Sequence, residues 1–157
     1  MPYFKIPLSN FQAEKLIIHQ DYLMKTKSIT QTATFNAPSQ AVYEALLDPK
    51  KHAAFTGANA KIDKKINGKF SVYDGYCHGY NIELVKNEKI VQAWHFAEDG
   101  WPDDHFSICT FLFEQTGNKT KLTFMQTGVP EHKVIALTSG WKEYYWKPLK
   151  EYLNPPL

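Results

Sequence analysis

Near the end of the chain stands Ser139-Gly-Trp-Lys-Glu-Tyr-Tyr-Trp-Lys-Pro-Leu-Lys-Glu-Tyr-Leu153, the stretch that decides the fold. From Val134 onward, apolar and aromatic residues recur at offsets of three and four, which predicts one face of a helix about 20 residues long. The members of this face are Leu137, Trp141, Tyr145, Leu149 and Tyr152. Because the face carries wide rings, we expect it to hold the helix apart from a facing sheet and to leave a cavity between them. The alternative is that the rings fill a closed core.

Pro148 lies inside this helical pattern. Proline has no backbone N–H, so the carbonyl of Tyr144, four residues earlier, loses its helical partner and clashes with the proline ring. We therefore expect the helix to bend at Pro148 or to end early, with Leu149 to Leu153 directed onto the edge of the sheet.

The residues before the helix show the pattern of an antiparallel sheet. Ser28–Phe35 alternates polar with apolar residues, as in a half-buried strand, and Asn67-Gly68 and Asp74-Gly75 are favoured hairpin pairs. Two helices are predicted between these features, one opened by Ala37-Pro38 and a short one over Lys50 to Phe55. The order of one strand, two helices, about six strands and a long helix predicts an α+β fold, with an antiparallel sheet wrapped around the C-terminal helix.

A chain of 157 residues suits one domain with a sizeable core. We expect residues 1–25, where apolar residues show poor periodicity, to be an N-terminal extension, and residues 26–157 to form a single domain. The N-terminus lacks a basic segment followed by an apolar run, and no apolar run approaches ~18 residues, so we expect no membrane partner. Cys77 and Cys109 are too few and too far apart for a disulfide framework, which agrees with an expected cytoplasmic location.

Composition favours some classes of partner over others. The net charge is +2 and all 18 basic residues are lysine, so the chain has no arginine for bidentate contacts with phosphate or guanine. We therefore expect no nucleic-acid partner. Aromatic residues make up 15% of the chain, which predicts an interior built largely from rings.

Three common motifs of phosphate-binding, catalytic and metal sites do not occur in this sequence. It has no Gly-rich phosphate loop, no Gly-x-Ser-x-Gly elbow and no His-Glu-x-x-His, and its six histidines do not stand at metal-ligand spacing. We expect no catalytic residue, no metal and no cofactor. Asp103-Asp104-His105 is a compact acid–imidazole cluster, and a solvated loop that caps a strand is favoured there over an acid–base or hard-metal site.

The candidate ligand-binding residues are those expected to face the space between sheet and helix. Trp94 and Trp141 either line a cavity there or fill the core. Asn81 and Gln126 fall within strands and would orient a ligand if they point inward; the alternative is that they face water or bind each other. Cys109 is expected to be an inert buried thiol. The full set is Phe70, Asn81, Trp94, Phe96, Trp101, Cys109, Phe111, Phe124, Gln126, Trp141 and Tyr145.

Several of these residues belong to an ordered series of motifs that spans about Ser28 to Leu153. The series resembles the family of activator of heat-shock-protein-90 ATPase homologues. It comprises Ala54-Phe-Thr56, Asn67-Gly-Lys-Phe70, Asp74-Gly75, Leu84-Val85, Ile90-Val91, Trp94-His-Phe96, Trp101-Pro-Asp-Asp-His-Phe106, Gly128-Val-Pro130 and Gly140-Trp-Lys-Glu-Tyr-Tyr145. The resemblance implies the helix-grip fold of the START-like superfamily, which is similar to the birch-pollen-allergen fold.

What the resemblance implies about function leaves three hypotheses. Stand-alone members of the superfamily typically bind apolar ligands, and we expect this chain to bind a small apolar or aromatic molecule without catalysis. Eukaryotic family members carry this region as the C-terminal domain of a co-chaperone, so the alternative is a stress-response protein that contacts a heat-shock chaperone. The chain departs from the family at Asn67, where glycine is usual, and at His95, where a basic residue is usual. A cyclase or hydratase is the third hypothesis.

Overall fold

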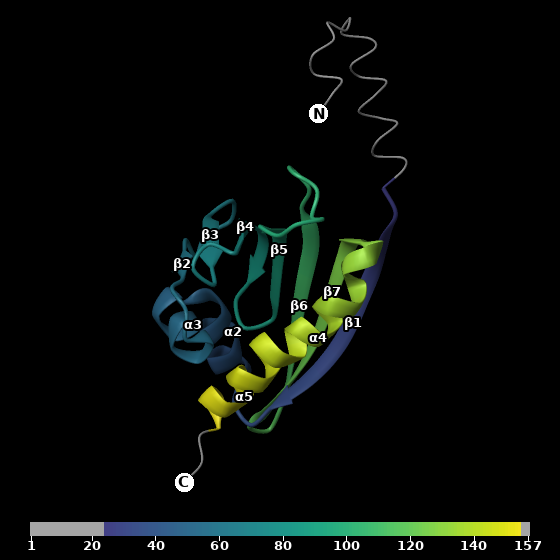
Figure 1. The fold of residues 1–157 in the computed structure, drawn as a ribbon. Coiled ribbons are helices and arrows are strands. Elements are labelled where there is room, and N and C mark those ends of the chain that lie inside the picture. Colours follow the sequence, from purple (N-terminus) through teal and green to yellow (C-terminus); the bar gives the residue numbers. More distant parts are fainter. Residues whose placement is uncertain (1–23, 155–157) are drawn as a thin grey trace, which may run out of the picture.

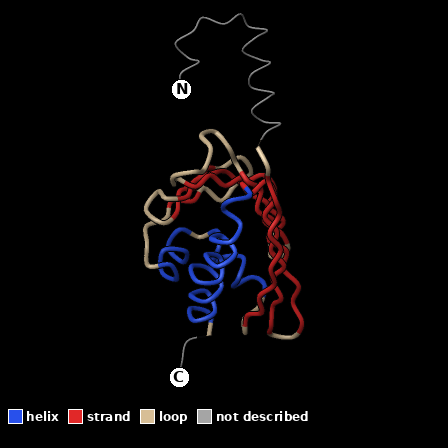
Figure 2. The backbone as a smooth tube through the Cα atoms, turned by 45° about the vertical axis from the view of Figure 1, so that its right-hand side comes forward, coloured by secondary structure: helices blue, strands red, loops and turns tan. Residues whose placement is uncertain are grey.

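The structure, a computed structural model, describes residues 24–154. The predicted extension of residues 1–25 therefore lies almost entirely outside the described residues. One curved sheet forms the first layer, and helices lie on its concave side as the second (Figures 1 and 2). The elements in chain order are β1 (Thr26–Phe35), α2 (Ser39–Leu47), α3 (Pro49–Thr56), β2 (Lys61–Ile62), β3 (Lys69–Val72), β4 (Cys77–Val85), β5 (Lys89–Phe96), β6 (Ser107–Thr116), β7 (Lys119–Pro130), η2 (Glu131–Lys133), α4 (Val134–Trp141), η3 (Lys142–Trp146) and α5 (Lys147–Leu153).

The sheet has seven strands in the order β1-β7-β6-β5-β4-β3-β2, and every neighbouring pair is antiparallel. The first strand pairs with the last, and the strands between follow one another as hairpins from β2 to β7. The long C-terminal helix, made of α4, η3 and α5, crosses the concave face diagonally (Figure 1). This architecture confirms the predicted α+β helix-grip fold.

Strand alternation places the large rings between the sheet and the helix, as predicted. On β6 and β7, for example, Phe111 lies directly opposite Phe124, and both side chains point to the concave face. Six of the rings expected in this space are at most 5% exposed: Trp94, Phe96, Phe111, Phe124, Trp141 and Tyr145. The concave face therefore holds the core of the domain.

The two short helices, α2 and α3, cover the part of the concave face next to α5 (Figure 1). The boundary between them is set by Asp48, whose carboxylate accepts hydrogen bonds from the backbone N–H groups of Lys50 and Lys51 at 2.9 and 3.0 Å. A side-chain hydrogen bond from Lys64, together with these N–H groups, lowers the pKa of Asp48 to about 2. Asp48 therefore caps α3 as an anion over most of the pH range.

The C-terminal helix is α-helical at both ends and π-helical in the middle. Residues four apart drift around an α-helix by about 40° per step, because each residue turns the helix by about 100°. Leu137, Trp141, Tyr145 and Leu149 are spaced by four, so a continuous α-helix would carry them off one face. The π-helical stretch Lys142–Trp146, whose next residue bonds back over five positions to Lys142, compensates for this drift.

The predicted break at Pro148 takes a different form in the structure. The helix does not end early, because α5 continues to Leu153 with Pro148 in its first turn, where a missing N–H is tolerated. The perturbation instead appears as the π-helical turn just before the proline. The carbonyl of Tyr144, which cannot bond to Pro148, accepts a hydrogen bond from the Tyr73 hydroxyl at 2.5 Å.

Candidate functional site

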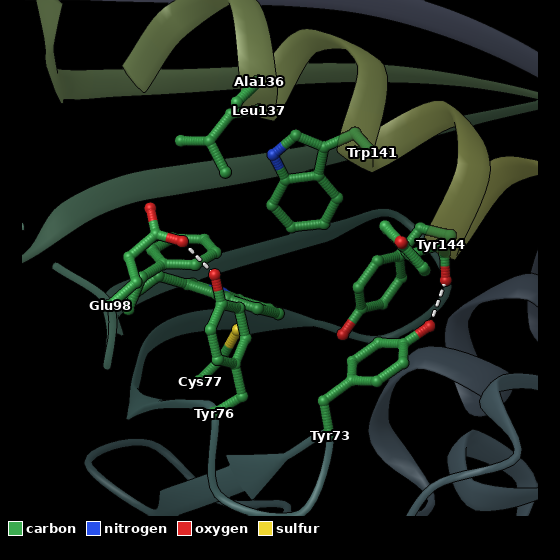
Figure 3. A pocket seen from close by; sticks show the side chains of 12 residues that line it. Tyr73, Tyr76, Cys77, Glu98, Ala136, Leu137, Trp141 and Tyr144 are labelled. Carbon is green, nitrogen blue, oxygen red and sulfur yellow. Dashed lines mark hydrogen bonds between the residues drawn. The ribbon is translucent and has the colours of Figure 1, made fainter. Parts of the chain in front are cut away.

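A cavity of about 450 Å³ lies between the sheet and the helix, bounded by α4, η3, the turn before β4 and the end of β5. We call it the helix cavity. Figure 3 shows its lining side chains converging from the helix and from the strands. Its wall consists of seven aromatic side chains, four small or apolar ones and a single charged group. These are Tyr73, Tyr76, Trp94, Phe96, Trp141, Tyr144 and Tyr145, then Cys77, Ala136, Leu137 and Gly140, and finally Glu98.

The helix cavity exists because the helix presents small residues opposite wide rings. Ala136 and Gly140 lie on the helix side of the wall, together with Leu137, Trp141 and Tyr144. A Cβ atom added at Gly140 would have Tyr144 as its nearest neighbour, at 4.0 Å. The space next to Gly140 is therefore open, and side-chain size at this position controls the volume that remains.

Glu98 brings a charge to the cavity wall and links the loop after β5 to the start of the helix. Its carboxylate accepts a hydrogen bond from the Tyr76 hydroxyl and pairs with the Lys133 ammonium at 3.1 Å (Figure 3 shows the first of these). Partial burial and the hydrogen bond to Glu98 both raise the pKa of Tyr76 above its ordinary value. The phenol therefore stays protonated and donates to the carboxylate at neutral pH.

On the α3 side of Tyr145, a buried histidine contacts the cavity wall. His52, which is 2% exposed, has its Nε2 atom 3.0 Å from the Tyr145 hydroxyl, and its Nδ1 atom has no hydrogen-bond partner. Burial lowers the pKa of His52 to about 4 and raises the pKa of Tyr145 well above its usual value. Both groups are therefore neutral at pH 7, and the pair orients the phenol without adding charge to the wall.

The thiol in the wall is also neutral. Burial, and secondarily the charge on Glu98, raises the pKa of Cys77 far above that of a free thiol. Burial likewise raises the pKa of Cys109, which agrees with the inert buried thiol expected from the sequence. Neither cysteine is a thiolate at neutral pH, so the helix cavity is an apolar, uncharged space apart from Glu98.

Two buried glutamine side chains on the sheet accept hydrogen bonds from tryptophan N–H groups. Gln126 accepts from the Trp141 indole at 2.8 Å and donates to the Ser107 hydroxyl at 2.8 Å. Gln92 accepts from the Trp94 indole at 2.9 Å and donates to Asn81 at 2.9 Å. These bonds fix the orientation of two rings that line the cavity. Gln126 and Asn81 point inward, which was the condition for orienting a ligand. Their amide groups, however, form hydrogen bonds with other residues of the protein.

Four of the eleven sequence-predicted site residues line the helix cavity: Trp94, Phe96, Trp141 and Tyr145. Phe70 and Phe111 lie deeper, beside a separate void of about 10 Å³ that is too small for a ligand. Trp101 packs on Phe96 with ring centroids 4.8 Å apart and lies outside the wall. Asn81, Cys109, Phe124 and Gln126 are buried in the core and also lie outside the wall.

Sequence reasoning missed the remaining residues of the wall. Tyr73 and Tyr76 flank the turn at Asp74-Gly75, and the strand pattern gives no reason to direct them toward the helix. Gly140 carried a usable signal, since a residue without a side chain next to Trp141 on a ring-bearing helix indicates space. His52 carried none, because its contact with Tyr145 spans 93 positions in the chain.

The described residues offer no metal cluster and no membrane-spanning helix. Within residues 24–154, no cluster of three or more histidine, cysteine, aspartate or glutamate side chains has the geometry to hold a metal ion. No helix in the same range combines the length and the apolar character needed to cross a bilayer. Asp103 and Asp104 are exposed, as expected of a solvated loop.

Comparison with known proteins places the chain among chaperone-related sequences. A family model described as "Activator of Hsp90 ATPase homolog 1-like protein" matches residues 36–154. An uncharacterised protein of Schizosaccharomyces pombe is 33% identical over 82% of this chain and 38% of its own length. The human activator of 90 kDa heat shock protein ATPase homolog 1 is 30% identical over 80% of this chain and 37% of its own length. The chain thus spans less than two-fifths of these relatives.

Solved structures agree with the sequence relatives. The crystal structure of an HSP90 activator from Plasmodium falciparum superimposes with a TM-score of 0.74 and 25% identity, over 82% of this chain and 97% of that one. CalU16 from Micromonospora echinospora has a TM-score of 0.68 at 18% identity, over 83% of this chain and 78% of its own, and shows the shared fold. With the family model covering most of the domain, the chain belongs to the family of activator of Hsp90 ATPase homolog 1-like proteins.

Proposed function

We propose that this domain binds a small apolar or aromatic molecule in the helix cavity. The observation that carries the proposal is the cavity itself, with about 450 Å³ of space behind a wall dominated by aromatic rings. Ligand sites in proteins typically have volumes of roughly 300–1,000 Å³, apolar walls and a few placed polar groups. The polar groups here are the Glu98 carboxylate and the tyrosine hydroxyls.

The electrostatics of the wall support binding without catalysis. The Glu98 carboxylate in the wall is held by the Tyr76 hydroxyl and the Lys133 ammonium. Three further groups in or behind the wall that could act as a base or nucleophile are Cys77, His52 and Tyr145. Burial shifts the pKa of each in the direction that keeps the side chain uncharged at pH 7. Nucleophilic or general-base chemistry requires a group activated near the working pH. A site of this kind favours ligands selected by shape and ring stacking.

The test compares two substitutions on adjacent helix residues. Gly140→Leu places a bulky side chain in the open space of the cavity wall, whereas Ser139→Gln places a long polar side chain on the exposed side of the same helix. A fluorescent apolar probe titrated into each variant should bind Gly140→Leu at least tenfold more weakly than the unmodified chain. Ser139→Gln should bind the probe unchanged. Equal probe binding by all three proteins would contradict a ligand site in the helix cavity.

A second candidate function is contact with a heat-shock chaperone, and the relatives favour it. This chain matches the solved chain of the Plasmodium falciparum HSP90 activator over 97% of the length of that chain. In addition, the convex side of the sheet exposes large apolar side chains that are 39–40% accessible. We call this the outer sheet face, defined by Tyr80, Ile82, Leu112 and Met125.

The chaperone hypothesis is tested by binding and by ATPase rate. Leu112→Lys combined with Met125→Lys places two charges on the outer sheet face, and Ile135→Lys is the matched control because Ile135 is apolar, 85% exposed and on the helix. If this function is correct, only the double variant should weaken binding to the chaperone of the source organism, by tenfold or more. We expect ATPase stimulation by the isolated chain to be weak, because its low net charge and lack of arginine provide little electrostatic steering. Strong, saturable stimulation would instead make the chaperone role the main one.

A further inference from the structure

We propose that His78 and His95 form a two-histidine site for a first-row transition-metal ion on the convex side of the sheet. The two residues are direct partners in the register of β4 and β5, so their side chains leave the same side of the sheet next to each other. They are separated by 17 positions in the sequence, which is why spacing along the chain does not reveal them. The site lies on the opposite side of the sheet from the helix cavity and does not depend on the proposed ligand.

The separation of the two rings fits one shared ion. Their centroids are 4.9 Å apart and their planes are tilted by 41°. A metal–nitrogen bond of about 2.0–2.1 Å places each ring centroid roughly 3.2 Å from the ion. For nitrogen–metal–nitrogen angles of about 90° to 110°, the two centroids would then lie roughly 4.5–5.2 Å apart. The observed separation falls within this range without any rearrangement of the strands.

His95 is held with one ring nitrogen free to coordinate. Its Nδ1 atom lies 2.9 Å from the backbone carbonyl of His105. A carbonyl only accepts, so Nδ1 carries the proton and Nε2 keeps its lone pair. A backbone carbonyl on the far nitrogen is the usual support for a metal-binding histidine, because it fixes both the tautomer and the ring orientation. The His105 ring is itself fixed, with its Nε2 atom 2.6 Å from the carbonyl of Gly128.

His78 is accessible and suited to the same role. Its side chain is exposed, and the Phe106 ring packs edge-on against it, with centroids 5.9 Å apart.

With two imidazole ligands, the remaining coordination positions are left to water or to another molecule. Within the described residues, no third histidine, cysteine or carboxylate completes a cluster. Imidazole suits Cu²⁺, Ni²⁺ and Zn²⁺, and the expected order of affinity is Cu²⁺ above Ni²⁺ and Zn²⁺. The ion should therefore be exchangeable rather than permanently bound.

The experiment titrates Cu²⁺ and Zn²⁺ separately into the chelator-treated full chain by isothermal calorimetry. A second readout is quenching of tryptophan emission by Cu²⁺, because the Trp101 ring lies 6.4 Å from the His95 ring. The variants are His78→Gln and His95→Gln, and the matched control is His132→Gln, an exposed histidine on η2. We expect one ion per chain for the unmodified protein and for the control, and at least tenfold weaker binding for each of the other two.

Folding does not confound this test. His78 is exposed, so His78→Gln should fold, and the glutamine amide in His95→Gln can still donate to the His105 carbonyl; thermal unfolding without metal checks both. Absence of saturable binding would overturn the proposal. So would equal affinity in His78→Gln, a loss confined to His95→Gln, or a loss of the same size in His132→Gln.

Discussion

The inner face of the C-terminal helix meets the sheet in two halves that differ in packing. The open half, along α4 and the start of η3, borders the helix cavity, whose other side is formed by residues of β4 and β5. The filled half runs from Trp146 to Leu149. Trp146 faces β6 and β7 and packs against Phe124 with ring centroids 5.3 Å apart, and Leu149 is fully buried. Trp141 stands at the boundary, 5.1 Å from Trp94 on one side and 4.4 Å from Phe124 on the other.

Both halves are rich in aromatic rings, so ring content alone does not decide between a core and a cavity. The difference lies in the small residues of the open half, Ala136 and Gly140, for which the filled half has no counterpart among its buried helix residues. Close ring pairs contribute about 0.5–1.5 kcal/mol each beyond their buried area, and the filled half contains several. On one helix face, the residues of the filled half thus contribute to stability, and the small residues of the open half leave space for a ligand.

The largest expected effect comes from truncating a ring in the filled half. Phe124→Ala should lower the free energy of unfolding by about 3–5 kcal/mol, because the surrounding rings cannot collapse into the space it leaves. Leu137→Ala in the open half should cost under about 2 kcal/mol, since its side chain already borders a cavity. Urea unfolding of both variants measures the difference. Equal losses would show that the two halves are packed alike.

Truncating Trp141, the ring at the boundary, tests whether this residue is packed like the filled half or like the open half. Trp141→Ala should cost about 3–5 kcal/mol if the ring belongs to a filled core. A much smaller loss, accompanied by altered affinity for an apolar probe, would show that Trp141 behaves as part of a roomy wall. Chemical denaturation and probe titration on the same variant provide both values.

Lowering the pH tests whether the region behind Tyr145 is dry. His52 has a pKa of about 4 in the folded chain and about 6.5 when unfolded. The unfolded state therefore binds the proton more tightly, so stability is full above about pH 6.5 and falls as the pH drops toward 4, by roughly 3 kcal/mol. His52→Gln should lose this component. Urea unfolding of both proteins at pH 7 and pH 4.5 measures it, and identical pH dependence would mean that water reaches His52.

A smaller effect is expected from the amide that holds Trp141. Gln126→Leu leaves the Trp141 N–H buried without an acceptor, which should cost about 1–3 kcal/mol. Adding Trp141→Phe removes the unpaired N–H, so the two substitutions together should cost less than the sum of each alone. A double-mutant cycle by denaturant unfolding measures this coupling. Strict additivity would show that the bond does not hold the ring.

The smallest predicted change is a gain in stability. Gly140→Ala should raise the free energy of unfolding by up to about 1 kcal/mol, because alanine favours the helix and the added methyl group enters open space. The same methyl group should weaken ligand binding in the helix cavity. Thermal unfolding and probe titration separate the two effects, and a loss of stability would mean that the open half is more tightly packed than described.

Much of the fold could be predicted because it rests on local patterns. Strand alternation placed Phe111 and Phe124 on the inner face, and the helical spacing of Trp141 and Tyr145 identified the face that packs on the sheet. The roles of the buried amides could not be predicted in this way. Whether Gln126 meets a ligand or a tryptophan N–H depends on where the helix crosses the sheet, which is a long-range property.

The position of the cavity could not be predicted from the sequence for the same reason. Tyr73 and Tyr76 reach the cavity only because the turn between β3 and β4 lies beneath the helix. His78 and His95 meet only through the register of two strands. In each case the residues are ordinary in their own segment, and their proximity arises from tertiary structure alone.

The π-helical turn at Lys142–Trp146 also bears on the length of the chain. Its hydrogen bonds span five positions instead of four, so the turn holds one residue more than an α-helical turn would. Lys142 and Glu143 are exposed, so either can be replaced by another residue at little cost. Deleting either one would let the turn close with α-helical bonds and would leave the orientation of Leu149 nearly unchanged. A relative that is one residue shorter here can therefore present the same side chains to the core.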